Sequence, residues 1–324
     1  MAPQRILIVR LGAFGDILHT LAAAATVREN CPQARIDWLA EPRWHPLLEG
    51  NPHINEAVPF DRRDLGGAFA TLRQLRARSY DLIIDFQGLI KSALPAWLAG
   101  ATAITGYSRK AARESIAALF YSRTFTPASR HIVEQHVELA TYALARDVAA
   151  PRARIEFPIP KGLEEGALPG RFLLACPLAG WGAKQWPLDH YAELAGLTQA
   201  QLGLPLVVNG AHAQEARLRG IPGAMVHLSG LPGLIDATRR ATAVLGLDSG
   251  PLHLAAALRK PGVALFGPTD PARNGPYCDT ISVLRDPRSP VTYQRTAAPD
   301  AGLAAITPAR VLEALAAALA GVRA

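Results

Sequence analysis

The amino-acid sequence predicts an α/β protein built from two Rossmann-like domains. Short apolar segments typical of buried strands alternate with amphipathic segments typical of helices along the whole chain. Strands that alternate with helices favour parallel sheets covered by helices on both faces. With 324 residues, the chain is also longer than one hydrophobic core usually supports, so two domains are expected.

The predicted elements follow the same order in both halves of the chain. In the first half we expect strands at residues 6–9, 35–39 and 82–85, and helices near 17–30, 65–78, 91–98 and 111–120. In the second half we expect strands at 172–176, 206–208, 244–247 and 263–266, and helices near 188–202, 213–219, 233–242 and 251–258. A closing helix should begin at Pro308, because Thr307 before it is a good N-cap.

The segment 147–170 separates the two halves. It contains four prolines and several charged residues, which is typical of an interdomain linker. We therefore predict an N-terminal domain at residues 1–158 and a C-terminal domain at residues 159–324, facing a central cleft.

Composition and charge narrow the function classes. A hydrophobic content of 49% with 19% charged residues is typical of a globular protein, and three scattered cysteines indicate neither a disulfide framework nor a zinc site. The net charge of +7 suggests an anionic partner, such as a nucleotide, a nucleic acid or an acidic lipid surface. No secretory signal or membrane-spanning run is evident, so we expect a soluble, cytoplasmic protein that can touch a membrane.

The first loop of interest is "RLGAFGD", residues 10–16, between a predicted strand and a predicted helix. Its glycines lack the spacing of a dinucleotide-binding fingerprint, which counts against an NAD-dependent oxidoreductase. Asp16 has two compatible interpretations: it is an N-cap for the helix at 17–30, or a carboxylate that faces the cleft and acts as a base.

Two later loops carry features of an anion site. In "PLAGWGAKQWP", residues 177–187, Gly180 and Lys184 precede a helix and suit a phosphate, although a solvated surface lysine is the simpler interpretation. In "LDSGPLH", residues 247–253, a helix start should leave the N–H groups of Ser249, Gly250 and Leu252 available to an anion. The glycine-proline loop "ALFGPTDP" at 264–271 follows at once, so the two loops together predict a diphosphate site.

Six motifs in this order resemble glycosyltransferase family 9, and within it the lipopolysaccharide heptosyltransferase I branch. They are "GAFGDILHT" (12–20), "DFQGLIKSA" (85–93), "RESIAALFY" (113–121), "GAKQWP" (182–187), "LDSGPLHLAAAL" (247–258) and "LFGPTDP" (265–271). The resemblance implies a GT-B fold and an inverting, metal-independent enzyme without a cofactor. It also implies ADP-L-glycero-D-manno-heptose as donor and the Kdo sugar of Kdo-lipid A as acceptor.

The same resemblance assigns roles to single residues. It places the catalytic base on Asp16 and the donor-binding residues on Lys184, Asp248, Ser249, Gly250 and His253. The chain departs from the family at Gly180, where backbone N–H groups would replace hydroxyl contacts. The acid that binds the adenosine ribose falls on Glu215, although Gln214 also fits.

Cations of the N-terminal domain are the candidates for acceptor binding, because Kdo carries a carboxylate and lipid A carries phosphates. Those selected are Arg62, Arg63, Lys91 and Arg113. Positive charge would also hold the enzyme against the cytoplasmic face of the inner membrane, each basic residue contributing roughly 1 kcal/mol.

Two alternatives remain open at this point. One is a family 9 transferase with another sugar donor or acceptor, and the other is a noncatalytic protein that binds nucleotide sugars. The presence of Asp16, Lys184 and His253 weighs against the second. A nucleic-acid-binding protein is not supported, because the chain lacks a recognition-helix or aromatic-basic strand signature.

Overall fold

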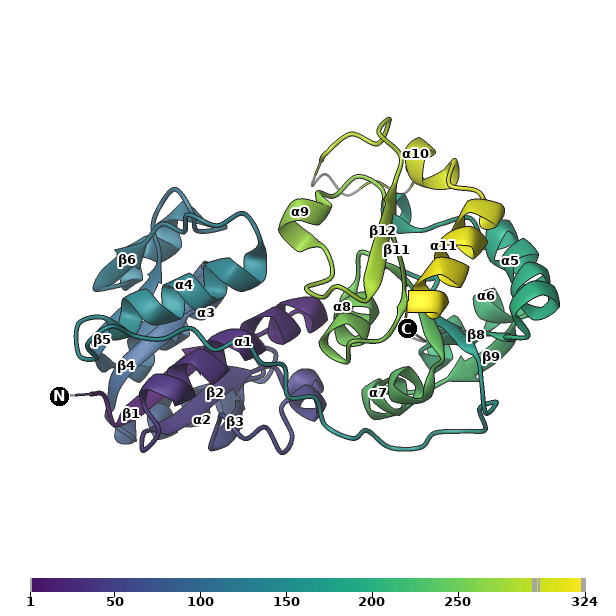
Figure 1. Ribbon diagram of the computed structural model, residues 1–324. Coiled ribbons are helices and arrows are strands. Elements are labelled where there is room, and N and C mark those ends of the chain that lie inside the picture. Colours follow the sequence, from purple (N-terminus) through teal and green to yellow (C-terminus); the bar gives the residue numbers. More distant parts are fainter. Residues whose placement is uncertain (1, 293–295, 297, 322–324) are drawn as a thin grey trace. The chain divides into compact units, whose positions relative to one another are not determined.

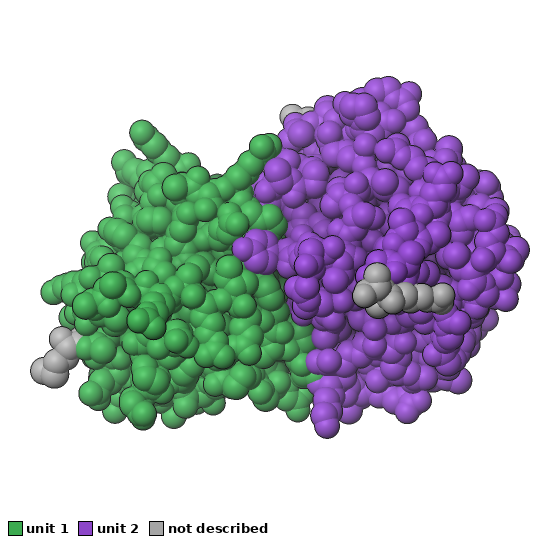
Figure 2. Space-filling view, viewed as in Figure 1, with its two compact units in different colours: residues 1–160 green, residues 161–324 purple. Residues whose placement is uncertain are grey.

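The computed structural model describes residues 2–292, 296 and 298–321 and divides the chain into two compact units. Unit 1 comprises Met1–Pro160 and unit 2 comprises Lys161–Ala324, coloured green and purple in Figure 2. The division falls two residues after the predicted boundary. Each unit has its own sheet and its own buried core.

Unit 1 contains a six-stranded parallel sheet with the order β3-β2-β1-β4-β5-β6 (Figure 1). The strands are β1 (Arg5–Val9), β2 (Arg35–Ala40), β3 (Glu56–Pro59), β4 (Tyr80–Asp85), β5 (Ala101–Tyr107) and β6 (Arg123–Phe125). Strand β1 lies in the middle, so that Ile6 pairs with Ile36 on one side and Leu82 on the other. Both faces of β1 are covered, which explains why its residues from Ile6 to Val9 are all apolar and fully buried.

Helices cover both faces of this sheet. They are α1 (Phe14–Asn30), α2 (Leu65–Ala77), α3 (Ile90–Ala99) and α4 (Ile132–Leu144), with 3₁₀ helices η1 (Pro42–Leu47) and η2 (Ser115–Phe120). Helix α1 packs against α4, and α3 packs against both α2 and η2. Connections between parallel strands are right-handed. From the centre of the sheet the chain runs through β1, β2 and β3 toward one edge and through β4, β5 and β6 toward the other, so the connecting helices fall on opposite faces.

Unit 2 repeats the topology, with the order β12-β11-β10-β7-β8-β9 and all pairs parallel. Its strands are β7 (Leu173–Ala175), β8 (Leu206–Gly210), β9 (Met225–Leu228), β10 (Ala243–Leu247), β11 (Gly262–Phe266) and β12 (Ile281–Arg285). Its helices are α5 (Leu188–Leu202), α6 (Glu215–Arg219), α7 (Leu231–Arg240), α8 (Gly250–Ala257), α9 (Pro271–Asn274), α10 (Ala301–Ala304) and α11 (Pro308–Gly321). The predicted fold class, α/β with two Rossmann-like domains, is confirmed.

The closing helix α11 begins at Pro308 as predicted, and the Thr307 hydroxyl accepts a hydrogen bond from the Arg310 N–H at 3.4 Å. It packs against α5 and β11, as α4 packs against α1 in unit 1. The buried Trp186 indole donates to the Ile306 carbonyl at 2.9 Å. This bond ties the loop after β7 to the segment that enters α11.

One predicted helix is wrong. Residues 111–120 form a turn followed by the 3₁₀ helix η2, because hydrogen bonds bind the turn to the loop after β4. The Glu114 N–H donates to the Gly88 carbonyl at 3.0 Å, and the Glu114 carboxylate accepts the Ile90 N–H at 2.7 Å. These long-range bonds replace the bonds that a continuous helix would need.

The segment after α4 follows unit 1 instead of hanging free. The Thr26 hydroxyl donates to the Arg154 carbonyl at 2.9 Å and accepts the Arg154 N–H at 3.0 Å. His53 lies 2.9 Å from the Glu156 carboxylate. The first part of the predicted linker is therefore part of the fold of unit 1.

Two of the three cysteines are buried in the folded units or nearly so. Burial raises the pKa of the Cys31 thiol to about 11 and that of the Cys176 thiol to about 12. Among the helices described, none has both the length and the apolar character needed to cross a membrane.

Candidate active site

Each sheet has one point where its strand order reverses, between β1 and β4 in unit 1 and between β7 and β10 in unit 2. In doubly wound sheets, ligands bind beyond the carboxyl ends of the strands at this point. Asp16 follows β1, Lys184 follows β7 and Asp248 follows β10. The topology therefore places these predicted residues where ligand sites occur in such folds.

The loop after β1 requires a glycine at residue 12. A Cβ atom at Gly12 would lie 2.5 Å from Nε1 of Trp44. The Trp44 ring stacks on Phe14, with 5.9 Å between ring centroids, so it has little freedom to move away. Glycine lets the loop pass under this ring on its way to Asp16.

Asp16 is not the N-cap of its helix, so that interpretation is wrong. Helix α1 begins at Phe14, with Ala13 as N-cap, and Asp16 lies in the first turn. Its carboxylate accepts the Ala13 N–H at 3.2 Å, which satisfies one of the free donors at the helix start. The side chain remains 28% exposed, so solvent reaches part of the carboxylate.

Two arginines face Asp16. A guanidinium nitrogen of Arg10 lies 2.7 Å from Oδ2 of Asp16, and one of Arg113 lies 3.7 Å from the same oxygen. Burial raises the pKa of Asp16, but Arg10 and Arg113 outweigh this effect and hold the pKa below its ordinary value. Asp16 is therefore ionised at neutral pH.

Arg10 was not among the predicted residues. It is only 3% exposed, and its second terminal nitrogen donates to the Phe86 carbonyl at the end of β4. A buried arginine needs such partners, because an unpaired charge away from water is costly. The signal in the sequence is a charged residue directly after the apolar strand at 6–9.

The two unit 1 motifs "DFQGLIKSA" and "RESIAALFY" meet around Asp85. The buried Asp85 carboxylate accepts the Tyr121 hydroxyl at 2.7 Å, the Ser92 hydroxyl at 2.8 Å and the Gln87 N–H at 2.8 Å. The Gln87 side chain in turn accepts the Leu11 N–H at 2.9 Å. This network fixes the loops that carry the neighbouring cations.

The four cations predicted for the acceptor differ in their surroundings. Arg62 contacts the Glu41 carboxylate at 3.2 Å, and Arg113 is 61% exposed beside Asp16. Burial, then the charges of Arg62 and Arg113, lower the pKa of Lys91. The Arg63 side chain forms no hydrogen bond or ion pair with the described residues, although its N–H donates to Asp61. Arg62, Lys91 and Arg113 thus share one electrostatic neighbourhood, while Arg63 stays outside it.

In unit 2, three predicted residues come together around Asp248. Nζ of Lys184 lies 2.5 Å from Oδ2 of Asp248, and Nε2 of His253 lies 3.7 Å from Oδ1. The Asp248 side chain is only 8% exposed. Burial raises its pKa, but His253 and Lys184 outweigh burial and hold the pKa far below the ordinary value. Asp248 is therefore an ionised, buried partner of the lysine.

The start of α8 is less open than predicted. Ser249 is the N-cap, but its hydroxyl donates back to the Leu247 carbonyl at 3.1 Å and caps nothing. The Leu252 N–H donates to the Ser249 carbonyl at 3.1 Å, so its predicted availability is wrong. The Ser249 and Gly250 N–H groups make no hydrogen bond within the residues that the structure describes and point to an anion site with the helix dipole.

Trp181 is a second residue that the sequence analysis missed. Nζ of Lys184 lies 4.5 Å from the centroid of the Trp181 ring, a cation–π contact that helps to fix the lysine. Gly180 before it is exposed, and a Cβ atom there would meet nothing within 4 Å. The loop after β7 therefore combines a held cation with open backbone.

Glu215 and Gln214 lie apart from this cluster, in the loop and helix after β8. Glu215 pairs with Arg219 at 2.7 Å and is 42% exposed. The Gln214 side chain accepts the Ala211 N–H at 3.0 Å, which stabilises the loop itself. The choice between the two residues for a ribose stays open.

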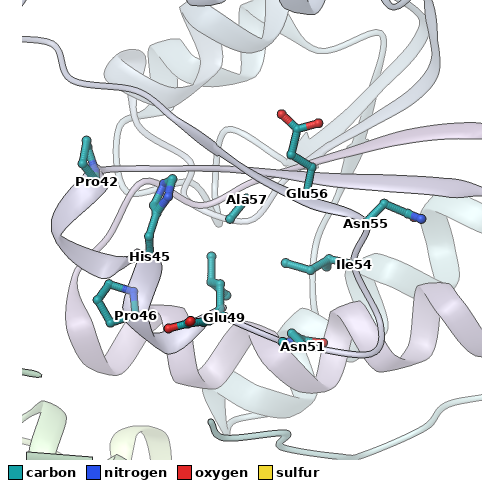
Figure 3. A pocket seen from close by; sticks show the side chains of 11 residues that line it. Pro42, His45, Pro46, Glu49, Asn51, Ile54, Asn55, Glu56 and Ala57 are labelled. Atoms are coloured by element: carbon teal, nitrogen blue, oxygen red, sulfur yellow. The ribbon is translucent and has the colours of Figure 1, made fainter. Parts of the chain in front are cut away.

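A separate hollow of about 560 Å³ lies in unit 1 between η1 and β3, and its side chains are drawn in Figure 3. His45, Glu49 and Glu56 are among its lining residues, which include neither lysine nor arginine. None of the predicted site residues lines it. Without a lysine or an arginine in its lining, the hollow lacks the cations that bind a phosphate or a carboxylate.

The residues around Asp16 and Asp248 support acid–base chemistry and anion binding. Within the described ranges, no group of three or more His, Cys, Asp and Glu side chains could hold a metal ion. The geometry offers a partly exposed carboxylate in unit 1 and a helix N-terminus with a lysine in unit 2.

Comparison with known proteins agrees with these observations. The model of glycosyltransferase family 9 (heptosyltransferase) matches residues 68–298, which contain all the predicted unit 2 residues but not Asp16. The chain is 31% identical to lipopolysaccharide heptosyltransferase 1 of Pseudomonas aeruginosa, over 85% of this chain and 81% of the relative. It is 30% identical to lipopolysaccharide heptosyltransferase 2 of Escherichia coli, over 96% and 97%.

A solved structure shows the same fold. The E. coli heptosyltransferase WaaC with ADP-2-deoxy-2-fluoro heptose superposes with a TM-score of 0.76, at 28% identity, over 95% of this chain and 98% of that chain. Its similarity extends over both units. The chain therefore belongs to glycosyltransferase family 9 (heptosyltransferase), and it is a glycosyltransferase with the GT-B fold.

Proposed function

We propose that the enzyme transfers L-glycero-D-manno-heptose from ADP-heptose to the Kdo sugar of Kdo-lipid A, the first heptose of the lipopolysaccharide inner core. The P. aeruginosa relative that carries the name heptosyltransferase 1 and the solved relative with an ADP-heptose analogue support this donor and this step. The chain is almost as similar to a heptosyltransferase 2. The proposed acceptor therefore depends on the motifs at 85–93 and 113–121, which resemble heptosyltransferase I.

Unit 2 is the proposed donor site. The free N–H groups of Ser249 and Gly250 and the positive end of α8 would bind the diphosphate. Lys184, held by Asp248 and Trp181, would stabilise the negative charge that develops on the departing ADP. These groups supply the charge stabilisation that a metal ion supplies in other transferases, so we propose a metal-independent reaction.

Unit 1 is the proposed acceptor site, with Asp16 as the general base. The Kdo hydroxyl oxygen would attack the anomeric carbon of the heptose, its proton would pass to Asp16, and the bond to ADP would break with inversion. Because Arg10 and Arg113 lower the pKa of Asp16, proton transfer should occur late, when the attacking oxygen has become acidic. Lys91 and Arg113 would bind the Kdo carboxylate.

The single observation that carries this proposal is the ionised and partly exposed Asp16 at the switch point of unit 1. The test is mass spectrometry of Kdo-lipid A after incubation with ADP-heptose. We expect one added heptose with the wild type and almost none with Asp16→Ala. Asp279→Asn, at an exposed carboxylate of unit 2, is the control and should be fully active.

Either of two results would count against the proposal. Full activity of Asp16→Ala would remove its role as base. A wild type that binds ADP but adds no heptose would redirect the search to another donor sugar or acceptor.

We also propose that the enzyme works at the cytoplasmic face of the inner membrane as a peripheral protein. The net charge of +7 suits an anionic leaflet, and the proposed acceptor is a membrane lipid.

A further inference from the structure

Unit 1 exposes a set of large apolar side chains on α2, α3 and η2, which we call the apolar face. Its most exposed members are Leu65, Phe69, Leu94, Trp97, Ile116 and Leu119, between 38% and 72% exposed. The three elements pack side by side, with α3 between α2 and η2. A contiguous apolar surface of this kind on a folded protein marks an interaction site.

The spacing of these residues shows that the face is organised. Leu65 and Phe69 are four residues apart on α2, and Leu94 and Trp97 are three apart on α3. Residues three or four apart share one side of a helix. Each helix therefore has an apolar stripe that its own unit leaves exposed.

A hollow of about 470 Å³ lies within the apolar face. Phe69 and Leu94 line it from α2 and α3, and Arg62 and Lys91 line it as well. The one acid in its lining is Glu114, whose carboxylate accepts the Ile90 N–H. The lining thus combines apolar walls with two cations and one acid. Arg62 also contacts the Glu41 carboxylate outside the lining, which leaves Lys91 as the lining cation without an ion pair among the described residues.

We propose that the apolar face is the surface through which the enzyme docks on an anionic phospholipid bilayer. The apolar side chains would enter the boundary between headgroups and acyl chains, and Arg62 and Lys91 would contact lipid phosphates. Trp97 suits this position, because an indole ring has an apolar body and a polar N–H.

Charge favours a bilayer over a second copy of the chain. A symmetric interface between two copies would bring the same surface together twice, and Arg62 and Lys91 would meet like charges. An anionic leaflet neutralises them instead. The apolar face is thus complementary in both polarity and charge to a lipid surface.

Docking there would also serve the reaction, and in this respect the inference rests on the proposed function. Arg62 and Lys91 line the same hollow, and the charges of Arg62 and Arg113 both lower the pKa of Lys91 after burial. Arg113 in turn faces Asp16. One group of cations thus joins the apolar face to the proposed base. A lipid-linked acceptor would stay in the bilayer while its sugar reaches Asp16.

The first experiment is co-sedimentation with phosphatidylglycerol–phosphatidylcholine vesicles that contain neither donor nor acceptor. We expect the wild type to bind, and Leu65→Ser with Phe69→Ser to lower the partition coefficient at least tenfold. A matched double variant, Leu163→Ser with Val291→Ser, removes similarly exposed side chains elsewhere and should change it less than twofold. Circular dichroism would confirm that both variants are folded.

The second experiment uses Trp97 as a reporter. Vesicles with brominated acyl chains should quench its fluorescence, and Trp97→Phe should bind but lose most of the quenching. Absence of quenching in the wild type would overturn insertion at this face.

Other results would also overturn the inference. These are equal vesicle binding by the Leu65/Phe69 variant and the wild type, no binding by the wild type, or a wild-type dimer in sedimentation velocity that the variant converts to monomers.

Transfer to a deacylated, water-soluble acceptor should be unchanged in the Leu65/Phe69 variant. This assay reports on the proposed function alone, so failure of one proposal is distinguishable from failure of the other.

Discussion

The two units have the same strand order, yet their switch-point carboxylates differ in kind. Asp16 in unit 1 is 28% exposed and faces arginines from the end of its own strand and from a distant loop. Asp248 in unit 2 is 8% exposed and is held by Lys184 from the neighbouring loop and by His253. One topology therefore supplies an accessible carboxylate suited to proton transfer and a closed carboxylate suited to holding a cation.

The largest effect should come from Asp16→Asn compared with Asp248→Asn. We expect Asp16→Asn to lower turnover by about 10²- to 10⁴-fold, the usual contribution of a general base, and to leave ADP affinity unchanged. Asp248→Asn should chiefly weaken ADP binding, because it releases Lys184. Steady-state kinetics and calorimetric titration with ADP would measure both. Equal loss of ADP affinity in both variants would contradict the distinction.

The next effect concerns stability. Lys184→Met leaves Asp248 buried with only His253 beside it and should lower the free energy of unfolding by about 3–5 kcal/mol. Arg113→Met, at an exposed cation, should change it by no more than about 0.5 kcal/mol. Urea denaturation of the two variants provides the measurement. Similar losses of unfolding free energy in the two variants would show that the Lys184–Asp248 pair and the Arg113–Asp16 pair contribute equally to stability.

A smaller effect should appear in the pH dependence of activity. Arg113 lowers the pKa of Asp16, so Arg113→Met should raise that pKa and reduce the ionised fraction at acidic pH. The acidic limb of the kcat profile, measured at saturating acceptor, should therefore move to higher pH. Near neutrality kcat should change little, and the KM for the acceptor should rise because Arg113 also belongs to the proposed acceptor site. Arg109→Met is the control, because it removes an exposed cation, in the segment before Arg113, that is not among the charges that shift the pKa of Asp16. An unmoved limb in Arg113→Met would exclude Asp16 as the titrating group.

The smallest effect separates the two ribose candidates. If Glu215 binds the ribose, Glu215→Gln should weaken ADP binding about five- to tenfold, because the neutral amide keeps an acceptor oxygen and loses only the charge-assisted part of the hydrogen bond, about 1 kcal/mol. Its stability should stay within about 0.5 kcal/mol of the wild type, because its pair with Arg219 is exposed. Gln214→Ala should instead cost stability through the lost Ala211 bond. The reverse pattern would assign the ribose to Gln214.

Much of the fold could be predicted from the sequence because the central strands are buried on both faces. Residues such as Ile6 to Val9 and Val263 to Phe266 are fully or almost fully buried, which gives uninterrupted apolar runs. Most of the strands not predicted, β3, β6, β9 and β12, lie at sheet edges, and β5 is the neighbour of the edge strand β6. These five strands contain exposed or half-buried residues, so they lack an uninterrupted buried run. Their pairing depends on neighbours that are distant in sequence.

The residues of the candidate site could be selected from the sequence, but their contacts could not. Arg10 reaches the loop after β4, 76 residues away, and Lys184 meets Asp248, 64 residues away. Both contacts follow from which strands are neighbours, and hydrophobic periodicity does not give strand order. The start of α1 at Phe14 was missed for a local reason, since Ala13 is a poor N-cap and only the Asp16 carboxylate compensates for it.

The raised pKa values of Cys31 and Cys176 have a practical consequence for chemical labelling. A thiol that stays protonated at neutral pH reacts slowly with maleimides and peroxides. A single new cysteine at an exposed position, such as Phe69→Cys on the apolar face, should therefore react much faster than these two native thiols. With only the partly exposed Cys278 replaced, a fluorophore placed there would report how fast the protein meets and leaves a lipid surface, without prior removal of Cys31 or Cys176.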